Sequence, residues 1–264
     1  MKGIGMFRIK EILRLKCEAQ DLNAEAFRLL REIVPESKND LFIVGDAHQR
    51  IYGHKIVLGQ CGVNIRGRSK KLKLNYRTTD EVRKWAVALL NGEKIDDMDD
   101  GLDTNSDYKS LYHGPKPIVK NFENYEEEVE YINEYIKGLK QEDANSRVCI
   151  VARTQKIIDG YSNYFTEKNI STTKISRNTK DNISDNGIRL ATMHRVKGLD
   201  FDHVIIASMN DGVVPLEISD KSDEKQIEDE KLLKEKSLVF VAATRAKKSL
   251  LVTSYGKQSI FISQ

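Results

Sequence analysis

The hydrophobic pattern of the C-terminal two thirds of the chain predicts a parallel α/β fold. Short apolar runs with the length and β-branched character of buried strands occur at residues 118–122, 147–152, 170–175, 188–191, 204–207 and 249–254. Between them, apolar residues repeat at helical spacing in segments 125–139 and 155–168. In the first of these helices the inner face comprises Val129, Ile132, Ile136 and Leu139. Strands that alternate with helices in this way favour one mainly parallel sheet covered by helices.

The N-terminal third has weaker patterning. Asn23 is a suitable N-cap for a helix that Pro35 stops, and residues 40–44 have the composition of a strand. The apolar face of that helix is expected to comprise Leu22, Ala26, Leu29, Leu30 and Ile33. A second helix follows Thr78, which forms a capping box with Glu81, and Gly92 ends it. Its apolar face is expected to comprise Val82, Trp85, Ala86, Leu89 and Leu90.

Composition excludes little. The 264 residues can bury a core in one large or two small domains, and 43 Lys and Arg against 40 Asp and Glu leave a net charge of only +3. Five cations fall within residues 65–73, where they either contact phosphates or form a solvated face. The three cysteines are far apart, which favours reduced thiols over a disulfide or zinc site. No signal or membrane span is visible, so we expect a cytoplasmic protein without a membrane partner.

An acidic segment at residues 93–107 is expected to form a mobile loop. Asp96, Asp100 and Gly101 stand at offsets typical of a calcium-binding loop. However, Met98 occupies a liganding position, and Asp107 stands where a bidentate Glu is expected. We interpret the spacing as a coincidence and predict no metal site.

The segment 187–208, GIRLATMHRVKGLDFDHVIIAS, places a polar loop between two predicted strands. Such a loop is expected at the carboxyl end of a strand, where open α/β sheets bind ligands. Lys197 and Gly198 suit a phosphate group, and Asp200 suits a sugar hydroxyl. By itself the segment favours an ordinary surface loop over a ligand site.

Four further strings occur around it: CEAQD at 17–21, GDAHQRIY at 45–52, LNYRT at 74–78 and LVFVAATRAK at 238–247. Together with TMHRVKGLDF at 192–201, they resemble motifs II to VI of UvrD/Rep-type superfamily I helicases, in the family's order. Five short motifs in sequence are much more specific than any one of them, and the resemblance covers most of the chain.

The resemblance implies a RecA-like fold in two parts. Residues 1–66 correspond to a remnant of the first motor lobe, and residues 67–264 to the second lobe without the large inserted subdomain of many relatives. It also implies ATP with Mg²⁺ as cofactor in the full-length parent. The implied partners are single-stranded DNA, with RNA as an alternative, and the missing first motor lobe.

The resemblance assigns roles residue by residue. Glu18 falls on the position that activates the attacking water, and Gln49 on the position that senses the γ-phosphate. Arg77 and the arginine finger, Arg245, reach the phosphates, since a guanidinium stays charged and binds two oxygens at once. The residues implied to bind the nucleotide are Gln49, Arg77, Lys197, Gly198, Asp200 and Arg245. Those implied to contact nucleic acid are Tyr52, Thr192, His194 and Arg153, although we favour a strand-end cap for Arg153.

Two departures argue against activity of this chain alone. Cys17 replaces the motif II Asp, and a thiol is a poor ligand for Mg²⁺, which prefers oxygen donors. No G-x-x-x-x-G-K-[ST] string occurs to cradle phosphates. We therefore expect part of an ATP-dependent DNA helicase that does not hydrolyse ATP unaided. The alternatives are a non-catalytic nucleic-acid or partner-binding module, and an unrelated α/β enzyme that uses the cleft for another nucleotide.

Overall fold

The computed structural model describes residues 22–37, 40–46, 51, 56–93, 101, 108–176, 181, 186–216 and 225–262. It divides into two compact units, Met1–Leu72 with Lys94–Thr104, and Lys73–Glu93 with Asn105–Gln264. The predicted division at residues 66 and 67 lies close to the first of these boundaries. Cys17, Glu18, Gln49 and Tyr52 lie outside the described residues.

The first unit is built around α2, Ala24–Ile33, and the 3-10 helix η2, Leu58–Cys61. As predicted, Asn23 caps α2, and its Oδ1 accepts a hydrogen bond of 2.9 Å from the N–H of Ala26. The buried apolar side chains of the cluster are Phe27, Leu58, Cys61 and Val63. The predicted apolar face is wrong in part, since Leu29 and Ile33 are 60% and 57% exposed. In the part of this unit that the structure describes, η2 is the main element packed against α2, which leaves the side of the helix with Leu29 and Ile33 exposed.

The strand predicted at residues 40–44 is not formed. Phe42 is 94% exposed, and Asp40 instead makes an ion pair of 2.7 Å with Arg31. In the described part of this unit no second strand offers hydrogen bonds, and an isolated strand has no stability of its own.

A six-stranded parallel sheet forms the centre of the second unit, in the order β3-β8-β7-β4-β6-β5. The strands are β3 (Ile118–Phe122), β4 (Val148–Ala152), β5 (Thr172–Lys174), β6 (Ile188–Thr192), β7 (Phe201–Ile206) and β8 (Ala246–Tyr255). All six coincide with predicted apolar runs. The predicted α/β fold with one parallel sheet is therefore confirmed.

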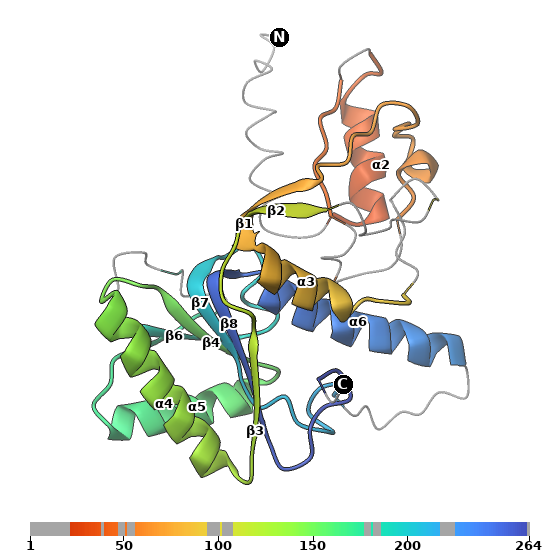
Figure 1. Cartoon of the computed structure of the whole chain (residues 1–264). Helices are drawn as coiled ribbons and strands as arrows, with labels where there is room; N and C mark the ends of the chain where they lie inside the picture. Colours follow the sequence, from red (N-terminus) through yellow and green to blue (C-terminus); the bar gives the residue numbers. More distant parts are fainter. Residues whose placement is uncertain are drawn as a thin grey trace. The chain divides into compact units, whose positions relative to one another are not determined.

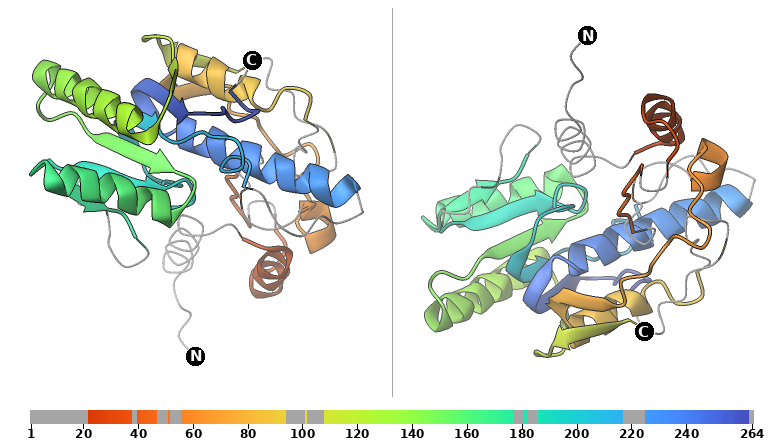
Figure 2. Two further views of the ribbon diagram at one scale, coloured as in Figure 1. Left: turned by 90° about the horizontal axis from the view of Figure 1, so that it is seen from below. Right: turned by 90° about the horizontal axis from the view of Figure 1, so that it is seen from above.

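Helices cover both faces of this sheet (Figure 1). On one face lie α4, Tyr125–Glu142, and α5, Gln155–Glu167, which begin at the N-caps Asn124 and Thr154. On the other lies α6, Lys225–Ala243, with α3, Asp80–Ala88, packed against it. Figure 2 shows these layers from two further directions. Over the residues that the structure describes, no helix combines the length and apolar character needed to cross a bilayer.

A separate two-stranded parallel sheet joins β1, Leu74–Thr79, to β2, Lys109–Tyr112. The polar sequence LNYRTT gave no strand signal, so β1 was not predicted. Thr79 caps α3, one residue later than expected, and accepts a hydrogen bond of 3.4 Å from Val82. The hydroxyl of Thr78 is engaged instead by Asn75 Nδ2, at 2.7 Å.

Glu128, in the first turns of α4, is fully buried at 0% exposure. Its carboxylate accepts hydrogen bonds from the Ser208 N–H at 2.9 Å, the Tyr161 hydroxyl at 2.6 Å and the Ser208 hydroxyl at 3.1 Å. Ser208 follows β7 with a φ of 57°, a left-handed conformation that costs energy for a residue with a side chain. Glu128 therefore ties α4, α5 and the end of β7 together and holds that backbone conformation.

We predict that Glu128→Ala lowers the free energy of unfolding by about 2–4 kcal/mol, because the buried Ser208 N–H and Tyr161 hydroxyl lose their acceptor. Urea denaturation of the two proteins measures the difference. The control is Glu130→Ala, at an exposed position of the same helix, which should change stability by about 0.5 kcal/mol or less. Equal effects at the two positions would contradict this account of Glu128.

Candidate functional site

The central polar loop is a crossover from the carboxyl end of β6 to the amino end of β7, parallel strands that β4 separates. Residues 193–200 make the connection without a helix. Met193 and Val196 are both 0% exposed and anchor the crossover, and Gly198 turns it with a φ of 84°. The prediction that the whole loop lies at the carboxyl end is wrong for its second half, because the chain must return to the amino edge before β7 can begin.

Three predicted nucleic-acid residues gather at the carboxyl edge. Ala152 and Thr192 are register partners at the ends of β4 and β6, so Arg153 and His194 follow neighbouring strands. The Arg153 guanidinium binds both carboxylate oxygens of Glu235 on α6, with Nη2–Oε1 at 2.6 Å and Nε–Oε2 at 2.9 Å. Thr154, rather than Arg153, caps the helix that follows. Arg153 thus joins the end of β4 to α6.

His194 is half-buried beside this ion pair. Burial lowers the pKa of its imidazole, and the positive charge of Arg153 lowers that pKa further. The ring is therefore neutral near pH 7. A contact of His194 with nucleic acid would be a hydrogen bond or a stacking contact, and not an ion pair with phosphate.

Arg245 lies at the opposite, amino edge, where its carbonyl accepts a hydrogen bond of 3.0 Å from the N–H of Phe201. Its side chain is only 1% exposed. Nε donates to the Val241 carbonyl at 3.0 Å, and Nη1 reaches the Leu199 carbonyl at 3.4 Å. The guanidinium therefore braces the end of α6 against the crossover. A contact with an external phosphate requires this side chain to turn outward.

Asp200 stands at the same edge. Lys247 Nζ lies 2.7 Å from Asp200 Oδ1, and Arg147 Nη1 donates to the Asp200 carbonyl at 2.8 Å. The Asp200 side chain keeps 35% exposure, so one oxygen can still accept a hydrogen bond from a ligand hydroxyl. Lys197 and Gly198, the predicted phosphate contacts, lie on the crossover just before it.

Arg77 projects from a bulge in β1. The strand register shifts between Asn75 and Thr79, and Asn75 Oδ1 accepts the Arg77 N–H at 2.7 Å, which leaves the Arg77 side chain exposed. Two residues on, Thr79 packs against Gly114, where a Cβ would lie 2.7 Å from Thr79 Cγ2 and 3.1 Å from the Lys248 carbonyl. The strand that carries Arg77 therefore approaches the amino end of β8, which follows Arg245.

Glu81 secures that approach. His113 Nδ1 lies 3.0 Å from one of its carboxylate oxygens, and the N–H of Gly114 donates to the other at 2.9 Å. These two hydrogen bonds lower the pKa of Glu81 to about 2, so it stays ionised at any physiological pH.

Sequence reasoning missed three partners in this site. Glu235 lies in a helix rich in charges of both signs, where nothing distinguishes it from its solvated neighbours. Arg147 precedes an apolar run and was placed within the strand. Lys247 is the last residue of the motif VI string, and its place directly after Ala246 is the one signal in the sequence that points to it.

Comparison with known proteins decides the family. The model of the UvrD-like helicase C-terminal domain matches residues 70–180 and 172–257, and that of the UvrD/REP helicase N-terminal domain matches residues 9–56. The chain belongs to the UvrD-like helicases. Both edges of the sheet lie in the part of this UvrD-like chain that matches the C-terminal domain.

Individual relatives agree with this assignment. ATP-dependent DNA helicase Rep of Buchnera aphidicola is 26% identical over 184 residues, which cover 70% of this chain and 25% of the relative. The "Probable DNA helicase" of Mycoplasma pneumoniae is 25% identical over 92% of this chain and 43% of its own length. The UvrD-like chain thus spans less than half the length of either relative.

The C-terminal domain of a possible DNA helicase from Lactobacillus plantarum has the same fold. The alignment has a TM-score of 0.50 at 15% sequence identity, and covers 72% of this chain and 92% of that domain.

For the UvrD-like chain we predict that Arg245→Ala lowers the free energy of unfolding by about 1–3 kcal/mol, since it removes a buried side chain, the donor to the Leu199 carbonyl and one of the two side-chain donors to the Val241 carbonyl. Lys247→Ala is the control, because Lys247 is 42% exposed and its ion pair contributes about 1 kcal/mol or less. Thermal and urea denaturation measure both. If Arg245→Ala is as stable as the parent chain, the inward guanidinium has no structural role.

Proposed function

We propose that the chain supplies the second motor lobe of an ATP-dependent DNA helicase, with single-stranded DNA at the carboxyl edge of its sheet and ATP phosphates at the amino edge. One observation carries this proposal. The crossover separates Thr192 and His194 from Asp200, and so delivers the predicted nucleic-acid and nucleotide contacts to opposite edges of one rigid sheet.

At the carboxyl edge the direct contacts are the Thr192 hydroxyl and the neutral imidazole of His194. Both groups bind without a net charge, which suits a track that must release the strand at each step. Arg153 has a positioning role, because Glu235 already pairs its guanidinium and the pair holds the start of the crossover against α6. The stacking role of Tyr52 remains a prediction.

At the amino edge, Arg77 and an outward-turned Arg245 bind phosphate oxygens. The residues here fit the anionic phosphates and not the metal ion, since no group of three or more His, Cys, Asp or Glu in the described part of the chain could hold one. In this proposal, Mg²⁺ and the phosphate loop are supplied by the first lobe of the helicase, as in the family. Hydrolysis of ATP supplies the free energy, and closure of the lobes brings the arginines to the phosphates. The roles of Glu18 and Gln49 stay predictions.

A second candidate is a non-catalytic module that binds nucleic acid or a partner protein. The inward guanidinium of Arg245 favours it, as does Cys17 at the position of a metal-binding Asp. The two candidates differ in whether Arg245 ever contributes to ATP turnover.

The test is single-stranded-DNA-dependent ATP hydrolysis by the full chain, alone and with a separately produced first lobe of a UvrD-like helicase. We expect no turnover alone. We expect turnover with the added lobe, and a fall of about a thousandfold on Arg245→Ala. Turnover by the chain alone that requires Arg245 would show that it holds the phosphates itself, which contradicts the proposal. No turnover with the added lobe, together with retained DNA binding, would favour the non-catalytic module.

A further inference from the structure

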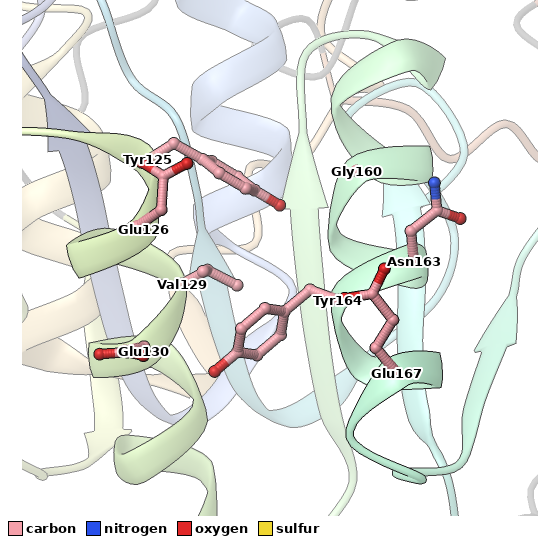
Figure 3. A pocket seen from close by; sticks show the side chains of 8 residues that line it. All are labelled: Tyr125, Glu126, Val129, Glu130, Gly160, Asn163, Tyr164 and Glu167. Atoms are coloured by element: carbon pink, nitrogen blue, oxygen red, sulfur yellow. The ribbon is translucent and has the colours of Figure 1, made fainter.

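A groove of about 260 Å³ opens between α4 and α5, on the face of the sheet opposite to α6 (Figure 3). Its lining includes Tyr125, Glu126 and Glu130 from α4, and Gly160, Tyr164 and Glu167 from α5. None of these residues belongs to either edge described above.

The rim of the groove is acidic. Glu126 and Glu130 are four residues apart on α4 and so line one side, while Glu167 lines the other. All three are exposed, and within the described parts of the chain none makes an ion pair. In a chain whose net charge is +3, these three carboxylates therefore make the rim of the groove locally acidic.

The floor of the groove is aromatic. Figure 3 shows the Tyr125 and Tyr164 rings directed into the space between the helices from opposite sides. Gly160 makes room for Tyr125, since a Cβ there would lie 3.3 Å from the Tyr125 hydroxyl oxygen. The Lys168 Nζ lies 5.6 Å from the centre of the Tyr164 ring, so one edge of the floor already has a cation over an aromatic face.

The Tyr125 hydroxyl is a hydrogen-bond donor that needs an acceptor. Its oxygen is buried and has no hydrogen-bond partner in the described part of the chain. Burial, with the neighbouring Glu128, raises the pKa of Tyr125 to about 12, so the group remains a neutral donor. A buried donor without an acceptor costs free energy, and an incoming carbonyl would relieve that cost.

We propose that this groove docks a basic segment of a partner protein, with an Arg or Lys side chain inserted between Tyr125 and Tyr164. The rings bind the aliphatic stem and cationic head, and Glu126, Glu130 and Glu167 neutralise the charge. A backbone carbonyl of the segment accepts the hydrogen bond of Tyr125 once the ring turns toward the groove, because its hydroxyl is buried beneath Gly160 in the free chain. The volume accommodates one long side chain, and the three carboxylates repel nucleic acid, so the occupant is a protein segment. The docking face is separate from both edges of the motor lobe.

The experiment is fluorescence anisotropy of a labelled helical peptide, about 12 residues long, with two arginines four positions apart, titrated with the full chain. The matched peptide has citrulline in place of both arginines, which keeps the shape and removes the charge. We expect the arginine peptide to bind to the parent chain, with an affinity that falls as the salt concentration rises. The triple variant Glu126→Gln, Glu130→Gln, Glu167→Gln should bind it about tenfold more weakly.

The control is Glu32→Gln, Glu36→Gln, Glu142→Gln, which changes the net charge equally at exposed positions elsewhere and should bind within about twofold of the parent chain. Equal losses of peptide affinity in the two triple variants would show that the peptide responds only to the net charge of the chain, which would overturn the proposal. Equal affinity of the citrulline peptide, full competition by spermine, or no binding of the arginine peptide would also overturn it. The peptide titration contains neither nucleotide nor DNA, so this test stands apart from that of the motor function.

Discussion

The rest of the second unit depends on how two parallel strands are joined without a helix. A connection between parallel strands has to return to the edge of the sheet from which it started, and usually does so through a helix of a dozen or more residues. Between β6 and β7 residues 193–200 make this return alone, held down by the buried Met193 and Val196. The remaining polar side chains of the segment are thereby distributed from one edge of the sheet to the other.

This constraint explains why Arg245 is buried. The end of the crossover needs a partner for the Leu199 carbonyl, and the last turn of α6 exposes carbonyls such as that of Val241. The Arg245 guanidinium donates to both, and the Thr244 hydroxyl also donates to the Val241 carbonyl at 3.0 Å. Arg245 is also the arginine that the helicase motif assigns to phosphate. Under the proposed function its two tasks compete, because a phosphate contact requires Arg245 to give up its hydrogen bonds to Val241 and Leu199. The proposal therefore links nucleotide contact to the position of the crossover, and through it to Thr192 at the other edge.

The strands of the parallel sheet could be predicted because they are buried on both faces and read as continuous apolar runs, as in residues 148–152 and 204–207. The strand predicted at residues 40–44 does not form, because pairing partners, and not composition, decide whether a strand forms. β1 was missed because LNYRTT has no apolar period; its bulge and the capping Thr79 follow from hydrogen bonds of Asn75. Local composition is a weak guide where tertiary partners are few.

In the candidate site, motif order predicts which residues contact ligands but not the directions of their side chains. The inward guanidinium of Arg245 depends on carbonyls that are distant in sequence or exposed only by a helix end. Glu128 and Glu235 have no signal at all, since a glutamate in an amphipathic helix is ordinarily solvated. Their burial follows from the left-handed Ser208 and from Arg153, neither of which composition predicts.

The measurement that tests the central claim most directly is hydrogen–deuterium exchange of the full chain with and without a single-stranded oligodeoxynucleotide. If single-stranded DNA lies along the carboxyl edge, DNA slows exchange in the segments that follow β4 and β6, around Arg153 and His194. The segments around Asp200 and Arg245 then exchange as in the free chain. Protection confined to the amino edge, or spread equally over both, would contradict the division of the sheet into a nucleic-acid edge and a nucleotide edge.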